Sequence, residues 1–364
     1  MTRKIIGLMA IVMLTIACAG QAQRHWQSDH YTSAEGFYNP NLPPIEADLG
    51  RFFGILKRFI TDDAPDTEAF GLIPYETLAI DVLTQQSQDV AYRLGHSTVL
   101  LKLSGKYILT DPIFSERASP VQWVGPKRFH PVPVDIASLP NLFAVVISHD
   151  HYDHLDQDTI EMLATRAQHF MVPLGLGAYL RDWGVPSENI HELDWWQSKQ
   201  FNGFEFISTP AQHFSGRGMF NRNSTLWSSW VIQSPSHNIY FSGDSGYFDG
   251  FKTIGERYGP FDLTILENGA YNPDWSQVHM FPQETVQAHL DLKGKAMLPV
   301  HNGTFKLSFH GWSDPLEQVS KLSEKQGVLV QTPIMGEEVM LSEPKKYKKW
   351  WQPAFESQKM AQKD

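Results

Sequence analysis

An α/β fold is predicted for this chain from three observations on its sequence. From residue 90 onward, short apolar runs typical of strands alternate with segments typical of helices. The chain has 364 residues, of which 42% are hydrophobic and 12% aromatic. That is enough for a packed core in one large domain or two closely joined halves. Four of the apolar runs also end on histidine or aspartate, which places polar chemistry at strand ends.

The expected elements follow from apolar periodicity and from turn residues. Strands are expected at 92–103 and 106–114, paired around Ser104-Gly105, then at 141–148, 169–173, 204–213, 228–234, 238–247, 262–271 and 296–303, with closing strands in 327–341. Helices are expected at 156–167, with Asp156 as a candidate N-cap, and at 175–183, 249–258, 282–291 and 314–326.

The first residues have the form of a secretory signal. Arg3 and Lys4 precede an apolar run that is too short for a comfortable transmembrane helix. Leu14-Thr15-Ile16-Ala17 before Cys18 resembles a bacterial lipoprotein signal, which would make Cys18 the lipidated first residue. An ordinary signal peptide cut nearby is the alternative. The predicted organisation is a signal at 1–18, a Pro-rich tether at 19–50, an N-terminal segment at 51–90, a hydrolase domain at 91–342 and a basic tail at 343–364.

The stretch "RFFGILKRFI", residues 51–60, combines apolar and basic side chains. Phe52, Phe53 and Phe59 would lie on a wide apolar face of a helix with basic flanks. Interfacial helices that lie on membranes have this composition. A helix that packs into the protein core would have it too, and both interpretations stay open.

Charge and cysteine content narrow the function classes. The net charge of −10 differs from the basic excess typical of nucleic-acid binders, and it argues against a nuclease. Cys18 is the only cysteine in the chain, so no intrachain disulfide can form. Stability must therefore come from the core or from bound metal.

Seven residues at four expected strand ends can bind metal. His149 and His151 are two positions apart, so they point to the same side of an extended segment. Neutral imidazole and carboxylate are ligands for zinc and similar divalent ions. Seven ligands exceed one tetrahedral ion and suit two ions that share a carboxylate, with an open position for water. The seven are His149, His151, Asp153, His154, His213, Asp244 and His301.

The segment His149 to His154 has the His-x-His-x-Asp-His form, which resembles the metallo-β-lactamase superfamily. The resemblance implies an αββα sandwich with a dinuclear metal site at one edge of its two sheets. It also implies how the ligands divide between two divalent ions, with zinc as the expected metal. His149, His151 and His213 would hold the first ion; Asp153, His154 and His301 would hold the second; Asp244 would bridge them.

Longer stretches resemble the phospholipase D family that hydrolyses N-acyl phosphatidylethanolamine. They include "TDPIFSERASPVQWVGPKRFHPVP", "STPAQHF", "FSGDSGYF", "GAYNP" and "HMFPQETV", and the similarity runs from about Tyr92 to Phe305. Glu267 and Asn268 in "ILENGAYNP" stand where the animal enzymes have other residues. The loop "FSGRGMFNRNS" after His213 also departs from that family. Both departures border the expected site and put the preference for acyl chain or headgroup in doubt.

Individual roles follow from the chemistry of phosphodiester cleavage. Asp153 is expected to bind an ion and also to orient the attacking water. The resemblance places a functional histidine at His279, which would protonate the leaving alkoxide; the alternative is a histidine on the surface or one that only supports the metal ligands. Arg217 and Arg222 could hold a phosphate, although solvated loop charges would look the same. Asp111 is expected to hydrogen-bond a metal-binding histidine.

The sequence is compatible with three function classes. A membrane-associated phospholipase would use the segment 51–60 and the lysine- and tryptophan-containing tail to reach lipid. A hydrolase of a small soluble substrate, such as a lactone or β-lactam, would not need them. A non-enzymatic lipoprotein would tend to lose metal ligands, and here the set is intact. The first class implies a phospholipid partner and attachment at the periplasmic face of the outer membrane, and the animal relatives imply a homodimer.

Overall fold

The computed structural model describes residues 26–40, 42, 50, 54–55, 57–58, 61, 66–218 and 220–361. The predicted signal with Cys18 lies outside these residues, and so do Phe52, Phe53 and Phe59. Within 51–60, Arg58 pairs with Asp274 at 2.7 Å, and its guanidinium lies 4.1 Å from the ring centre of Phe309. The predicted membrane or core role of this segment stays a prediction.

The first of two seven-stranded sheets has the order β16-β3-β4-β5-β6-β7-β8. Pairing is antiparallel from β16 to β5 and parallel from β5 to β8. Most residues of its central strands are buried, because a sheet covered on both faces buries both sides of each strand. The strands are β3 (Val90–Gly95), β4 (Thr98–Leu103), β5 (Lys106–Thr110), β6 (Leu142–Val146), β7 (Ala167–Pro173), β8 (Ile190–Leu193) and β16 (Glu338–Met340).

The second sheet repeats this plan with the order β15-β14-β13-β12-β11-β10-β9. Its strands pair antiparallel from β9 to β12 and parallel from β12 to β15. Its strands are β9 (Ser198–Phe201), β10 (Phe204–Thr209), β11 (Ser229–Gln233), β12 (Asn238–Phe241), β13 (Phe261–Glu267), β14 (Gly294–Val300) and β15 (Leu329–Val330). The short strands β8 and β9 were not predicted from the sequence, because polar residues interrupt their apolar pattern.

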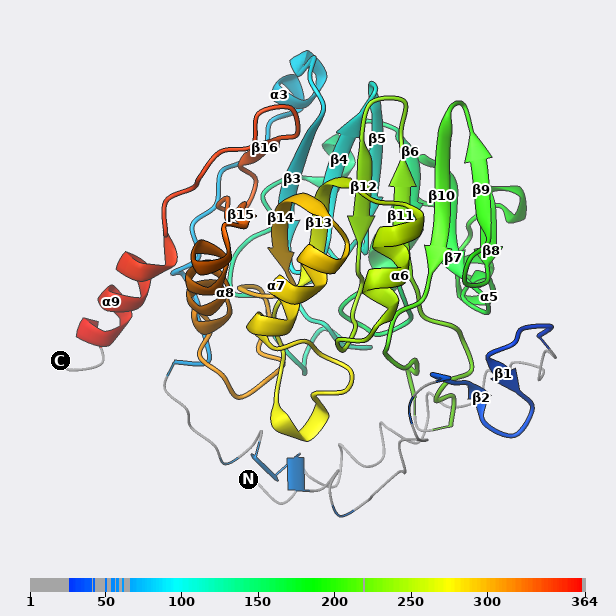
Figure 1. Cartoon of the computed structure of the whole chain (residues 1–364), viewed down its shortest axis with the longest axis horizontal. Helices are drawn as coiled ribbons and strands as arrows, with labels where there is room; N and C mark the ends of the chain where they lie inside the picture. Colours follow the sequence, from blue (N-terminus) through cyan, green and yellow to red (C-terminus); the bar gives the residue numbers. More distant parts are fainter. Residues whose placement is uncertain are drawn as a thin grey trace.

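The sheets pack face to face, and helices cover both outer faces, so the predicted αββα sandwich is confirmed (Figure 1). Trp230 is fully buried between the sheets, and its indole Nε1 donates to the carbonyl of Ile147, 3.0 Å away, just before the histidine segment. Helices α4 (Gln157–Leu163) and α5 (Gly177–Asp182) cover the first sheet. Helices α6 (Gly250–Arg257), α7 (Pro282–Asp291) and α8 (Asp314–Gln326) cover the second.

Shorter helices complete the chain, namely α3 (Ile80–Gln85), η1 (Ile136–Ser138), η2 (Ser187–Asn189) and η3 (Pro273–Trp275). Helix α4 is shorter than the predicted 156–167, because Ala167 begins β7. Asp156 precedes α4 without capping its backbone. Its carboxylate instead accepts hydrogen bonds from the backbone of Phe114 and Ser115, so it ties that loop to the helix.

Part of the predicted tether packs against the hydrolase domain. Strands β1 (Tyr31–Thr32) and β2 (Gly36–Phe37) form a small hairpin, and Phe37 is fully buried. Asn39 Nδ2 donates to the backbone carbonyl of His213 at 2.8 Å. This stretch therefore touches the backbone of a predicted metal ligand.

The predicted basic tail contains helix α9 (Trp351–Ala361). Trp351 is buried, and its Nε1 donates to Glu317 of α8 at 2.9 Å. The apolar side of α9 therefore packs onto the domain, which accounts for the tryptophans in an otherwise polar stretch. No helix in the described part of the chain is both long and apolar enough to cross a membrane.

Candidate metal centre

Four loops at one edge of the sandwich carry the seven predicted ligands. His149–His154 follows β6 of the first sheet. His213 follows β10, Asp244 follows β12 and His301 follows β14, all in the second sheet. Because the carboxyl ends of parallel strands meet at one sheet edge, the fold brings together side chains that are up to about 150 positions apart in sequence.

The first group of ligands consists of three histidines. Nε2 of His149 lies 2.8 Å from Nδ1 of His151, and Nε2 of His213 lies 3.3 Å from the same atom. All three rings therefore direct a nitrogen to one point, which corresponds to the first predicted ion position.

The second group consists of Asp153, His154 and His301. Nε2 of His154 and Nε2 of His301 each lie 3.3 Å from Oδ2 of Asp153. Oδ2 of Asp244 lies 3.2 Å from His154 Nε2 and 3.0 Å from His301 Nε2. It also lies 3.9 Å from His149 Nε2 and 3.8 Å from His213 Nε2, so this one carboxylate faces both groups.

Burial and neighbouring carboxylates shift the pKa values of the ligand histidines in opposite directions. Burial lowers the pKa of His149 well below its usual range. Burial acts the same way on His301, but the carboxylates of Asp244 and Asp153 outweigh it and raise the pKa of His301 to about 10. Within the described residues, Nε2 of His154, Nε2 of His301 and Oδ1 of Asp244 are buried without a hydrogen-bond partner. Divalent ions satisfy such converging nitrogens and oxygens, and the donor set fits zinc.

Neighbouring groups fix the orientation of the predicted ligands. Nδ1 of His154 donates to Oδ2 of Asp111 at 2.6 Å, which leaves Nε2 toward the site and confirms the role predicted for Asp111. Nδ1 of His213 donates to the carbonyl of Val278 at 3.0 Å. His96 Nε2 lies 2.9 Å from Oδ2 of Asp153. His96 therefore supports the side chain of Asp153.

His279 lies at the edge of the centre, held by a buried acid. Nδ1 of its ring is hydrogen-bonded to Oε1 of Glu267. The ring centre lies 5.2 Å from that of His213 and 5.4 Å from that of His301. Burial lowers the pKa of His279 to about 4, while burial beside Asp244 raises the pKa of Glu267 well above its usual range. The two groups are therefore hydrogen-bond partners in one buried pair at the edge of the centre.

Arg217 has a different role from the predicted phosphate contact. Its Nη1 donates to the carbonyls of Asp150 and Leu155, at 2.8 and 2.7 Å. Its guanidinium also lies 3.9 Å from the ring centre of Tyr152. The Arg217 side chain therefore holds the two ends of the His149–His154 segment together. Its guanidinium, which was expected to bind phosphate, makes these contacts instead.

Arg222 remains available to a ligand. It is exposed, and its guanidinium lies 4.7 Å from the ring centre of Phe214. Phe214 in turn contacts His151, with ring centres 4.7 Å apart. Arg222 therefore sits near the first group of ligands on the loop after His213.

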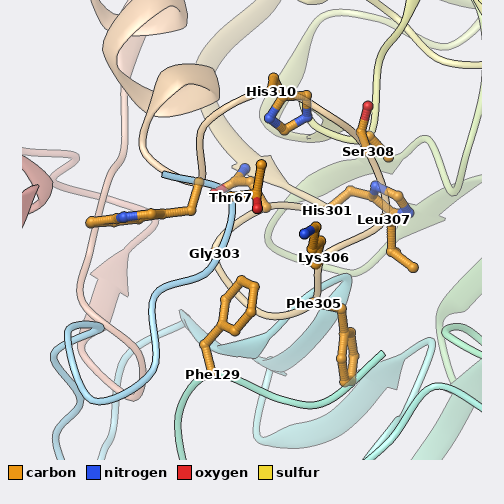
Figure 2. Close-up of a pocket in the computed structure, with 12 residues that line it drawn as sticks. Thr67, Phe129, His301, Gly303, Phe305, Lys306, Leu307, Ser308 and His310 are labelled. Carbon is orange, nitrogen blue, oxygen red and sulfur yellow. The ribbon is translucent and has the colours of Figure 1, made fainter. Parts of the chain in front are cut away.

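A small pocket lies beside His301 (Figure 2). The loop that follows His301 supplies much of its wall, including Phe305 and Lys306, and Phe129 faces them. Phe305 also packs edge-on against His96, with ring centres 5.3 Å apart. The pocket thus combines apolar surface with one cation next to the second group of ligands.

The family model described as a beta-lactamase superfamily domain matches residues 106–302. This range contains all seven ligands and most strands of both sheets. The chain belongs to the metallo-β-lactamase superfamily. As a member of this superfamily with an intact ligand set, it is a metal-dependent hydrolase.

Relatives of this superfamily member include proteins with and without a named activity. An uncharacterized protein of Mycobacterium tuberculosis is 50% identical over 261 residues, which cover 71% of this chain and 70% of the relative. The N-acyl-phosphatidylethanolamine-hydrolyzing phospholipase D 1 of Caenorhabditis elegans is 35% identical over 273 residues, which cover 71% of this chain and 77% of the relative.

Solved structures support the superfamily fold. The metallo hydrolase Igni18 of Ignicoccus hospitalis matches with a TM-score of 0.53 and 21% identity, over 71% of this chain and 99% of the other. A possible metal-dependent hydrolase of Veillonella parvula matches with a TM-score of 0.56 and 17% identity, over 70% and 99%. At these identities the likeness establishes the fold alone.

The sequence predicted no function for Glu267 in this superfamily member. It indicated only that Glu267 departs from the animal phospholipases. Its position at the end of an apolar strand, next in space to strands that end on Asp244 and His301, was the available signal. A buried carboxylate at such a strand end needs a partner, and that partner is His279.

Replacement of Asp244 by alanine should remove both ions. Its carboxylate faces both ligand groups, so without it both ions lose a ligand and only Asp153 is left to offset the charge of two cations. Inductively coupled plasma mass spectrometry should give about two divalent ions per wild-type chain and fewer than about half an ion per variant chain. One ion in the wild type, or two in the variant, would contradict the shared-carboxylate site.

Proposed function

We propose that the chain is a zinc-dependent phosphodiesterase of phospholipase D type. It would cleave N-acyl phosphatidylethanolamine to an N-acylethanolamine and phosphatidate. The main support is the 35% identity, over 77% of its length, to a nematode protein named for that reaction. The His279 ring beside the metal centre adds a chemical argument, because cleavage on this side releases a poor leaving group, the alkoxide of an alcohol.

Different residues of the chain would have separate roles in such a hydrolysis. Two divalent ions, when bound, would activate water near neutral pH and offset negative charge on phosphoryl oxygens. The Asp153 side chain is 15% exposed and that of Asp244 only 2%, so Asp153 faces the open side of the centre. Asp153 can accept the proton of the attacking water, held in place by His96. His279 can give a proton to the leaving oxygen.

A lipid substrate also requires contact with a lipid surface. Phe220 is 84% exposed on the loop that follows His213. Arg222 is exposed two residues later and lies over Phe214, next to His151. An exposed aromatic tip with a nearby cation suits the boundary of a bilayer with anionic phosphates. This loop differs from the animal enzymes and would give the chain its own docking element.

The bond that is cut can be identified by oxygen labelling. In heavy-oxygen water the label should enter phosphatidate, because water attacks phosphorus in the proposed reaction. Mass spectrometry of products from N-acyl phosphatidylethanolamine, phosphatidylcholine and an acyl lactone, incubated side by side, makes the comparison. Label in a free fatty acid, or turnover of the lactone alone, would replace the proposal with an acyl or lactone hydrolase.

Docking through Phe220 predicts a loss that depends on the lipid surface. Phe220→Ser should lower activity on phospholipid vesicles about thirtyfold, since it removes roughly 2 kcal/mol of apolar transfer energy. Activity on a short-chain soluble diester should stay close to wild type. Met360→Ser, at a 69% exposed side chain of α9, is the matched control and should change neither. Equal losses on both substrates would exclude a docking role.

We further propose that the chain is exported and attached through lipidated Cys18 at the periplasmic face of the outer membrane. The support is the basic, apolar and small-residue order that precedes this cysteine. Cells grown with labelled palmitate should label the wild type and leave Cys18→Ser unlabelled and released from membranes. An exported wild type without label would rule out the anchor.

A further inference from the structure

Glu267 is a fully buried carboxylate at the edge of the metal centre. It ends β13, whose neighbours β12 and β14 lead to Asp244 and His301. A buried acid that is not paired costs several kcal/mol. Glu267 stands where the animal phospholipases have another residue. Its contacts indicate which role offsets the cost of burying the carboxylate.

Both oxygens of Glu267 accept hydrogen bonds. Oε1 accepts from Nδ1 of His279, and Oε2 accepts from the backbone N–H of Ser245 at 2.6 Å. Ser245 directly follows the shared ligand Asp244. Glu267 therefore connects the loop of the shared carboxylate to the histidine at the rim of the site.

The contact with Glu267 also determines which ring nitrogen of His279 is free to act. Because Nδ1 donates to the acid, Nε2 is the nitrogen that remains for a ligand. A ring nitrogen of His279 lies within 4.8 Å of ligand atoms of His213 and Asp244. The ring thus stands between a buried acid on one side and the position of the reacting group on the other.

We propose that Glu267 is a positioning residue for His279 and prepares it to protonate the leaving oxygen of the substrate. The inference rests on the proposed phosphodiesterase function and adds a residue to it. The carboxyl group holds the ring through Nδ1, so that Nε2 points toward the reacting group.

The proposed step balances in atoms and charge. The oxygen of water bonds to phosphorus, and the bond from phosphorus to the ethanolamine oxygen breaks with its electron pair on that oxygen. The leaving oxygen takes the proton from Nε2 of His279 and departs as an alcohol. The proton lost by the attacking water restores the ring by way of solvent, so no other reactant is consumed.

A glutamine cannot replace Glu267 in this arrangement. The carboxylate accepts from two donors, whereas an amide has one acceptor oxygen and one donor nitrogen. In Glu267→Gln the amide nitrogen would face either Ser245 N–H or the Nδ1–H of His279. The ring would lose its partner or its orientation, and the variant would keep the volume of the wild-type side chain.

The test compares two diesters that share phosphatidate and differ in leaving group. One is N-acyl phosphatidylethanolamine, whose alkoxide needs a proton; the other is the para-nitrophenyl ester of phosphatidate, whose phenolate leaves without one. Glu267→Gln and His279→Ala should each lower kcat on the first substrate about 100-fold and change kcat on the second by less than about threefold. The double variant should lose no more than His279→Ala alone.

Glu284→Gln is the matched control for the glutamate substitution. Glu284 accepts a hydrogen bond from the backbone N–H of Phe281 at the start of α7, and glutamine can accept the same bond. This variant should behave as wild type on both diesters. Equal loss on both diesters in Glu267→Gln, or lower metal content than wild type, would overturn the proposal in favour of a purely structural role.

Histidine nitrogen NMR provides a readout that does not depend on activity. His279, assigned by its absence in His279→Ala, should carry its proton at Nδ1 in the wild type and lose that preference in Glu267→Ala. If the wild type cleaves neither diester, the phosphodiesterase proposal fails, and this measurement still decides the positioning claim. A wild-type ring protonated at Nε2 alone would overturn it.

Discussion

One buried carboxylate organises the functional edge of this protein. Oδ2 of Asp244 lies between 3.0 and 3.9 Å from a ring nitrogen of four histidines, which come from three different loops. So many buried nitrogens and oxygens are unfavourable without cations. Burial favours the neutral form of each ring, whereas contact with the carboxylates favours the protonated form. Divalent ions resolve the conflict, so the sandwich edge and the metal centre are expected to stabilise each other.

The framework around this centre is built to hold it rigid. Apolar side chains from both sheets pack into one core between the layers, and Trp230 joins that core to the residue after β6. Asp111 and Val278 fix two ligand rings, and Arg217 clamps the histidine segment. In the proposed function the loops around the centre contact the substrate, in particular through Phe220 and Arg222.

The seven ligands and the main strands could be predicted because their signals are local. Each ligand ends an apolar run, and His149 to His154 lie within six positions. The contacts of Glu267 with His279 and of residues 26–40 with the His213 loop were not predicted, because each forms only when separate loops meet in the folded chain. The predicted phosphate contact Arg217 illustrates the limit, since a basic loop residue looks the same whether it binds substrate or backbone carbonyls.

The stability of the protein with and without metal tests the central claim most directly. Chelator-treated wild type should unfold at a lower temperature than the same protein with excess zinc, because ions that bind only the folded state add about 2.7 kcal/mol at one hundred times their dissociation constant. Asp244→Ala should unfold at the same temperature under both conditions. An unfolding temperature of the wild type that does not respond to zinc or any other divalent ion would contradict the account.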